Sequence, residues 1–141
     1  MSDRAFVDTN VLVYAHDRSA GRKHEVAREL VGRLWQERSG VVSTQVLQEL
    51  YVNLRRKAGS PLSATLAREV IEDYLRWPLV ENGGEAILRA MAVEQRHGLS
   101  FWDALIVQAA QDAGVPVLYS EDLSHGHRYG PVTVENPFRT D

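Results

Sequence analysis

Ala5-Phe6-Val7-Asp8-Thr9-Asn10 sets a short apolar run directly before an acidic residue. A second apolar run, Val115-Pro116-Val117-Leu118-Tyr119, ends close to Asp122. Continuous apolar runs between polar residues are typical of strands that are buried on both faces of a sheet. We therefore predict two buried strands, with an acid at or near the carboxyl end of each.

Helical patterns lie between these two runs. Apolar residues recur at the spacing of one helix face in residues 26–35 and again in residues 66–75. Shorter strand-like pieces occur at residues 41–42, 79–80 and 132–134, each beside a Gly or a Pro. Parallel neighbours in a sheet need crossover connections, which are usually helical. The alternation therefore predicts an α/β fold with a parallel sheet between helices.

The composition is that of a single globular domain over residues 1–141, with 44% hydrophobic and 25% charged residues. The chain has no cysteine, which excludes a disulfide framework, a thiolate metal site and a thiol nucleophile. No apolar run approaches the length that spans a bilayer, and residues 1–6 lack the apolar stretch of a signal peptide. We therefore expect a cytoplasmic protein without a membrane partner.

The net charge of -3 is unusual for a nucleic-acid binder, because such proteins commonly carry an excess of positive charge. Basic residues nevertheless gather locally, as Arg18, Arg22 and Lys23 and as Arg55-Arg56-Lys57. Either group could be a solvated face. The second group extends from the predicted helix that carries Glu49, so it is the better candidate for contact with the phosphates of a nucleic acid.

Four acids are expected to converge on one edge of the sheet. Ligand sites of open parallel sheets lie beyond the carboxyl ends of the strands, and Asp8 and Asp122 both follow predicted strands. Asp103 begins a helix and shares its apolar face, which is an unusual place for a carboxylate. Glu49 lies six residues beyond Ser43, roughly 9 Å along the next helix, and could reach the same edge.

Each acid also has a purely structural explanation. Asp8 could cap the helix that follows it, and Ser100 with Asp103 fits a capping box. Glu49 could be a solvated helix residue, and Asp122 could be a turn residue.

Taken together, the acids favour a bound cation. Glu49 has Gln45 and Asn53 four residues away on either side, rather than Lys or Arg. Carboxylates gathered at one edge repel one another, and a cation relieves the repulsion. Without cysteine or a paired histidine motif, oxygen ligands favour Mg²⁺ or Mn²⁺ over Zn²⁺. Such ions suit phosphate substrates, because they activate water and neutralise the leaving oxygen.

Several segments resemble motifs of the PIN-domain ribonucleases, in particular the VapC-like toxins of type II toxin-antitoxin pairs. They occur in the family's order and spread over nearly the whole chain. The resembling segments are Phe6-Val7-Asp8-Thr9-Asn10-Val11-Leu12-Val13-Tyr14-Ala15, Ser43-Thr44-Gln45-Val46-Leu47-Gln48-Glu49-Leu50, Phe101-Trp102-Asp103-Ala104-Leu105-Ile106, Leu118-Tyr119-Ser120-Glu121-Asp122-Leu123 and Asn136-Pro137-Phe138.

The resemblance implies roles for individual residues. The catalytic acids would be Asp8, Glu49, Asp103 and Asp122, with Asp8 and Asp103 holding the metal, and Glu121 could replace Asp122 as the fourth acid. The polar residues that would support these acids are Thr9, Asn10 and Ser120.

The resemblance also implies a three-layer PIN-like sandwich with a central five-stranded parallel sheet, endonucleolytic cleavage of RNA, homodimerisation and a cognate antitoxin. The alternatives are a PIN nuclease of RNA processing that is not a toxin, and a non-catalytic module that binds RNA or regulates. An aspartate-nucleophile phosphatase is disfavoured, because the second acid that it generally needs two residues after Asp8 is Asn10 here. No glycine-rich phosphate loop occurs in the sequence.

Aromatic residues and histidines are weaker candidates for RNA contact. The stretch His125-Gly126-His127 could bind metal or contact RNA, but two exposed histidines near glycines more often form a solvated turn. Trp35, Trp77 and Trp102 could stack on bases, but Trp35 falls on an apolar helix face and is expected in the core.

Overall fold

The computed structural model of the chain describes residues 3–56 and 61–140. Lys57, one of the residues predicted to contact RNA, lies outside the described residues. In chain order the elements are β1 (Ala5–Val7), α1 (Thr9–His16), the 3-10 helix η1 (Arg18–Ala20), α2 (Arg22–Glu37), β2 (Gly40–Ser43), α3 (Thr44–Arg56), α4 (Ala64–Tyr74), β3 (Leu79–Val80), α5 (Gly84–His97), α6 (Phe101–Ala113), β4 (Val117–Tyr119), β5 (Arg128–Tyr129) and β6 (Val132–Glu135).

The strands form one sheet in the order β3-β2-β1-β4-β6-β5. The first five of these strands are parallel, as expected, and β5 pairs antiparallel with β6 at the edge. Sequence patterning did not predict β5, which is only two residues long and is joined to β6 by a tight turn. Gly130 in that turn has a φ of 63°, a conformation that glycine adopts without steric cost.

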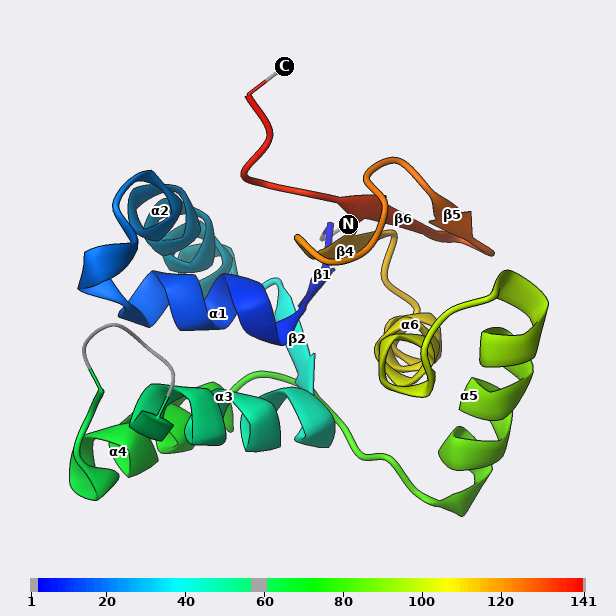
Figure 1. Cartoon of the computed structure of the whole chain (residues 1–141), viewed down its shortest axis with the longest axis horizontal. Helices are drawn as coiled ribbons and strands as arrows, with labels where there is room; N and C mark the ends of the chain where they lie inside the picture. The colour runs from blue at the N-terminus through cyan, green and yellow to red at the C-terminus, as the bar shows by residue number, and fades with distance from the viewer. Residues whose placement is uncertain (1–2, 57–60, 141) are drawn as a thin grey trace.

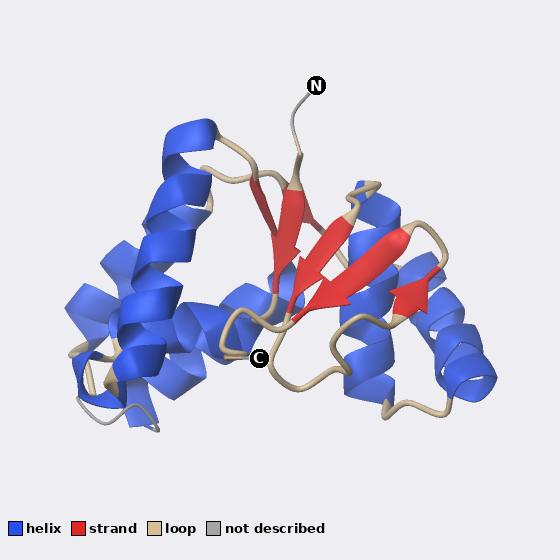
Figure 2. Ribbon diagram, turned by 90° about the horizontal axis from the view of Figure 1, so that it is seen from above, coloured by secondary structure: helices blue, strands red, loops and turns tan. Residues whose placement is uncertain are grey.

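Helices cover both faces of the sheet and make a three-layer α/β sandwich. Helices α1 to α4 lie on one side of the strands, and α5 and α6 pack together on the other (Figure 1). Seen from above, the twisted sheet runs between the two helical layers (Figure 2). The predicted fold class is therefore confirmed, and the strands of the centre are buried on both faces, as Phe6, Val7 and Leu118 show.

The register of the central strands decides where polar residues meet. Val7 of β1 pairs with Tyr119 of β4, so the residues that follow both strands emerge at the same edge. The Asp8 N–H donates to the Tyr119 carbonyl over 2.9 Å, and the Ser120 N–H donates to the Glu135 carbonyl over 3.0 Å. Parallel pairing therefore brings the start of the chain beside a loop more than a hundred residues later.

Two of the three tryptophans pack in or against the hydrophobic core. Trp77 is buried, and its ring lies 5.1 Å from the ring of Trp35, centroid to centroid. Trp77 also covers β2 so closely that a Cβ on Gly40 would lie 2.4 Å from the indole. Trp35 is confirmed as a residue packed against the core, whereas Trp102 is 63% exposed. Base stacking is therefore open only to Trp102 among the three.

Candidate active site

Asp8 lies between β1 and α1 and is 5% exposed. Its Oδ1 accepts from the Thr9 N–H over 2.7 Å, which is the predicted helix-capping contact. Its Oδ2 accepts from the Ser120 hydroxyl over 2.8 Å and from the Asn10 amide over 3.3 Å. Burial raises the pKa of Asp8 to about 7, although the hydrogen bonds from Ser120 and Thr9 oppose the rise. Asp8 therefore caps α1 with one carboxylate oxygen and joins the hydrogen bonds of the site with the other.

Glu49 reaches the edge of the sheet from the second turn of α3. The Ser43 hydroxyl accepts from the Val46 N–H at the start of this helix, as expected for a cap. The Thr9 hydroxyl donates to Glu49 Oε1 over 2.7 Å, and Gln45 Nε2 lies 3.4 Å from Glu49 Oε2. Glu49 is therefore held against the residue that directly follows Asp8, and the expected reach of this acid is confirmed.

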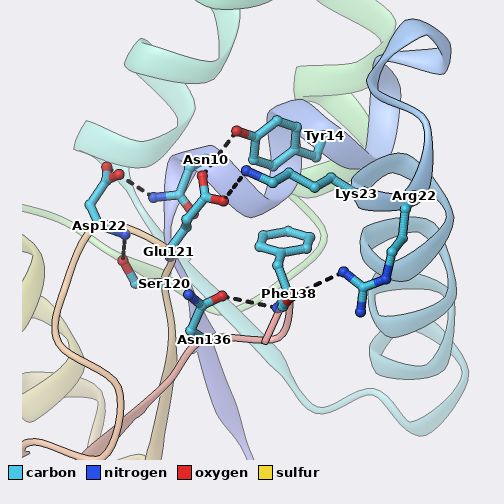
Figure 3. Close-up of polar contacts among 9 residues, drawn as sticks. All are labelled: Asn10, Tyr14, Arg22, Lys23, Ser120, Glu121, Asp122, Asn136 and Phe138. Carbon is cyan, nitrogen blue, oxygen red and sulfur yellow. Dashed lines mark hydrogen bonds and ion pairs between the residues drawn. The ribbon is translucent and has the colours of Figure 1, made fainter. Parts of the chain in front are cut away.

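Asp122 lies in the loop after β4 and is exposed, whereas Ser120 beside it is fully buried. The Asn10 amide Nδ2 donates to Asp122 Oδ2 over 3.1 Å, and the Asp122 N–H donates to the Ser120 hydroxyl over 3.2 Å (Figure 3). Because the same Nδ2 also donates to Asp8, Asn10 bridges two carboxylates. Asn10 and Ser120 thus each form hydrogen bonds with both Asp8 and Asp122.

Asp103 stands in the first turn of α6, and its N–H donates to the Ser100 hydroxyl over 3.1 Å. The predicted Ser100 cap is therefore present. Burial raises the pKa of Asp103, and the nearby charges of Asp122 and Glu49 raise it further. The same two charges raise the pKa of Asp8. The four acids consequently share one electrostatic environment, although they come from four different segments.

The donor set suits a hard cation, although it is not a closed cage. Within residues 3–56 and 61–140, no group of three or more His, Asp or Glu side chains is arranged to hold a metal by itself. In the same residues the ion pairs are Lys23–Glu121, Arg68–Glu72 and Arg89–Asp112, so none of the four acids is neutralised by Lys or Arg. Un-neutralised carboxylates with hydroxyl and amide neighbours are the oxygen-rich surroundings that Mg²⁺ or Mn²⁺ prefers.

A groove of about 640 Å³ runs beside these acids between α1 and α3. Thr9, Asn10, Glu49 and Asp122 are among the residues that line it, as is Asn53 further along α3. A substrate lying in this groove would therefore pass directly over the acidic edge of the sheet.

Arg55 and Arg56, which are predicted to contact RNA, are not among the residues that line this groove. Arg55 and Arg56 are exposed in the last turn of α3, and the Arg55 guanidinium donates to the Leu62 carbonyl. His125 is engaged as well, because its Nδ1 accepts from the Asn136 N–H over 3.0 Å. His127 packs on Tyr129 with ring centroids 4.4 Å apart. The histidine stretch is therefore an exposed turn, as expected, in which both rings have a contact within the chain.

Sequence reasoning missed Tyr14, Lys23 and Gln45 as parts of the site. Gln45 Nε2 lies within 3.4 Å of both Glu49 and the Trp102 carbonyl, so it links α3 to the start of α6. Tyr14 lies one helical turn after Asn10, a spacing that places both on one face of α1 and could have indicated it. Lys23 is the partner of Glu121, and only the fold brings them together.

The fold and the site together define a three-layer α/β protein with carboxylates gathered at the carboxyl edge of its parallel strands. The PIN domain family model matches residues 5–129. The chain belongs to the PIN domain family.

Solved structures with the same fold include VapC proteins and their complexes. VapC20 of Mycobacterium tuberculosis, described as a sarcin-ricin loop cleaving toxin, is 22% identical with a TM-score of 0.65, over 84% of this chain and 91% of that one. A toxin-antitoxin complex from Klebsiella pneumoniae is 17% identical with a TM-score of 0.69, and the match covers 96% of this chain and 99% of that one. DNA-bound VapBC from Salmonella typhimurium is 19% identical with a TM-score of 0.65, and the match covers 96% of this chain and 99% of that one.

These identities show a shared fold. A comparison with functionally curated proteins finds no match. In the part of the chain that the structure covers, no helix combines the length and the apolar character needed to cross a membrane.

Proposed function

We propose that this protein is a metal-dependent endoribonuclease that acts as the toxin of a toxin-antitoxin pair in the cytoplasm. The observation that carries the proposal is the group of acids around Asp8, which gathers at the carboxyl edge of the sheet without Lys or Arg to neutralise it among the described residues. Membership of the PIN family and the likeness to VapC structures support the nuclease and toxin assignments.

Asp8 and Asp103 would hold Mg²⁺ or Mn²⁺, with Glu49 and Asp122 beside them. When bound, such an ion lowers the pKa of water and offsets the negative charge that develops on phosphate oxygens. Ser120 and Asn10 keep Asp8 Oδ2 in place through hydrogen bonds.

Glu49 is the acid best placed to receive a proton. Its Oε1 is occupied by the Thr9 hydroxyl, while its Oε2 has only the longer 3.4 Å contact with Gln45. Oε2 therefore has capacity to accept a proton from the attacking water.

RNA binding has to come from local features, since the whole chain carries a net charge of -3. We propose that Arg55, Arg56 and Lys57 contact phosphates on the strand that leaves the groove. Contacts of this kind position an RNA without reading its sequence.

The protein partners in this proposal are a cognate antitoxin and a second copy of the chain. The antitoxin assignment is supported by the likeness to VapBC complexes. An antitoxin arginine could enter the acidic site, because a guanidinium satisfies carboxylates in a bidentate manner. A complex without a basic side chain near Asp8 would contradict that mode of inhibition.

The decisive experiment compares cleavage of a structured RNA by the wild-type protein with Mg²⁺, by the same protein with EDTA, and by Asp8→Asn. Asp112→Asn is the matched control, since Asp112 lies at the other end of α6 and pairs with Arg89. We expect EDTA and Asp8→Asn to lower the rate at least about a hundredfold, because the metal site is lost. The control should cleave like the wild type.

Equal cleavage by Asp8→Asn and the wild type would end the nuclease proposal. Expression in a bacterium separates the toxin from the RNA-processing alternative. A toxin arrests growth only with Asp8 intact, whereas RNA cleavage in vitro without growth arrest would favour a processing nuclease.

A further inference from the structure

Glu121 stands between Ser120 and Asp122 in the sequence, and its carboxylate points towards Tyr14 and Lys23 (Figure 3). The Tyr14 hydroxyl donates to Glu121 Oε1 over 2.9 Å. Lys23 Nζ forms an ion pair with Glu121 Oε2. Both carboxylate oxygens are thus occupied by partners on α1 and α2, and neither is directed towards Asp8 or Asp122.

Lys23 is held in place from three sides. Its ammonium lies 5.1 Å from the centroid of the Tyr14 ring and 5.9 Å from that of Phe138. The two rings pack edge to face, 5.1 Å apart. Phe138 is itself anchored, since its carbonyl accepts from Arg22 over 3.0 Å. This arrangement limits the freedom that an exposed lysine normally keeps.

The same loop connects this cluster to the acids. The Glu121 N–H donates to Asn10 Oδ1 over 3.1 Å, and the other end of that amide donates to Asp8 and Asp122. The orientation of the Asn10 amide is therefore determined by the position of the Glu121 backbone. If the loop moved, Asn10 would lose the contact that keeps its Nδ2 directed at the two carboxylates.

We propose that Tyr14, Lys23 and Glu121 form a positioning clasp, which holds the loop at Ser120–Asp122 against α1 so that Asp122 stays beside Asp8. This proposal rests on the proposed function. Two carboxylates repel one another, and the clasp opposes the separation. Glu121 accordingly acts through Asn10 and Asp122, and does not itself hold the metal. Small displacements of such groups lower rates severely, about a hundredfold for roughly 1 Å.

The test uses variants of the full-length protein that alter the clasp by small steps. Glu121→Gln removes the charge, Tyr14→Phe removes one hydroxyl, and Lys23→Met removes the ammonium while Lys23→Arg retains a positive charge. Arg89→Gln is the matched control, because it breaks an ion pair of similar exposure with Asp112.

Three measurements are made on each variant: hydrogen exchange of the residue 121–123 amides without metal, Mn²⁺ affinity by electron paramagnetic resonance, and kcat and KM for RNA cleavage. We expect Glu121→Gln and Lys23→Met to speed amide exchange and weaken Mn²⁺ binding, each about tenfold. We also expect them to lower kcat about ten- to a hundredfold with KM changed less than about twofold. Lys23→Arg should retain most of the Mn²⁺ affinity and of the kcat that Lys23→Met loses. Arg89→Gln should match the wild type.

A double variant separates positioning from direct metal binding. If Tyr14 acts only through Glu121, Tyr14→Phe with Glu121→Gln should be no worse than Glu121→Gln alone. Abolition of Mn²⁺ binding by Glu121→Gln, with Tyr14→Phe and Lys23→Met unaffected, would overturn the clasp in favour of a metal ligand. Unchanged amide exchange in Glu121→Gln would overturn it as well. A wild-type protein that neither binds Mn²⁺ nor cleaves RNA would overturn the proposed function, while the exchange data would still decide the clasp.

Discussion

Asp8 is a buried side chain that takes part in three kinds of interaction. It caps α1, it accepts hydrogen bonds from Ser120 and Asn10, and it lies near the charges of Asp122 and Glu49. Burial is the largest influence and raises its pKa to about 7, so the metal-free protein holds a proton there under mildly acidic conditions. A bound cation would favour the ionised form instead.

This shifted pKa makes a prediction about stability in EDTA. The unfolded carboxyl has a pKa of about 3.9, so between pH 4 and 7 the folded protein retains a proton that the unfolded chain has released. The contribution of Asp8 is therefore most favourable below pH 4, and it is lost as the pH rises through about 7. The loss should be on the order of 2–4 kcal/mol.

Urea unfolding of the wild type and Asp8→Asn at several pH values measures this effect. Asn does not titrate, so the free energy of unfolding of the wild type should fall relative to the variant between pH 5 and pH 7.5. Parallel curves for the two proteins would show that the pKa of Asp8 is not raised.

At the scale of the element, three of the four candidate acids, Asp8, Glu49 and Asp103, lie at or near the start of a helix. Ser100 caps α6 at 3.1 Å from the Asp103 N–H, and Ser63 caps α4 at 3.2 Å from the Leu66 N–H. The two caps are alike in geometry, but only the first holds a candidate catalytic acid. They form a natural pair for separating helix stability from activity.

Ser100→Ala and Ser63→Ala should each lower the free energy of unfolding by about 1 kcal/mol, since both remove an N-cap hydrogen bond. Only Ser100→Ala should also lower kcat for RNA cleavage, several-fold or more, because it frees the turn that carries Asp103. Thermal unfolding and steady-state kinetics check the two effects. Equal activity in both variants would mean that Asp103 does not depend on its cap.

At the scale of the whole molecule, the acidic edge is built from segments that meet only in the folded state. A cation bound there prefers the folded protein and stabilises it by mass action. The unfolded chain has no preformed site, since Asp8 and Asp122 are joined through Asn10 only when β1 and β4 pair. Metal binding at this edge would therefore be linked to global stability.

Mg²⁺ or Mn²⁺ at a hundred times its Kd should add about 2.7 kcal/mol to stability and raise Tm by about 5–10 °C. Asp8→Asn should lose this increase, and Asp112→Asn should keep it. Differential scanning calorimetry with and without the ion provides the measurement. The same rise in Tm for Asp8→Asn would place the stabilising ion elsewhere.

Much of this architecture is local and was predictable. Apolar runs before Asp8 and Asp122, helical periodicity at residues 26–35 and 66–75, and the capping pattern at Ser100 all correspond to observed elements. The short strand β5 was not predicted, because two residues carry no usable periodicity. The placement of Glu49 followed from helical rise alone, since the distance along α3 does not depend on distant residues.

The sequence by itself determined which acids could meet, because strand ends and helix starts are set by local patterns of apolar and capping residues. Only the tertiary structure decided which acid of the neighbouring pair, Glu121 or Asp122, faces Asp8. The choice depends on Lys23, which lies 98 residues from Glu121 in the chain, and on Asn10, which lies 112 residues from Asp122. The direction of two adjacent side chains is set by such distant partners, and no local pattern contains them. The acidic run after β4 thus divides into Asp122, which contacts Asn10, and Glu121, which contacts Tyr14 and Lys23.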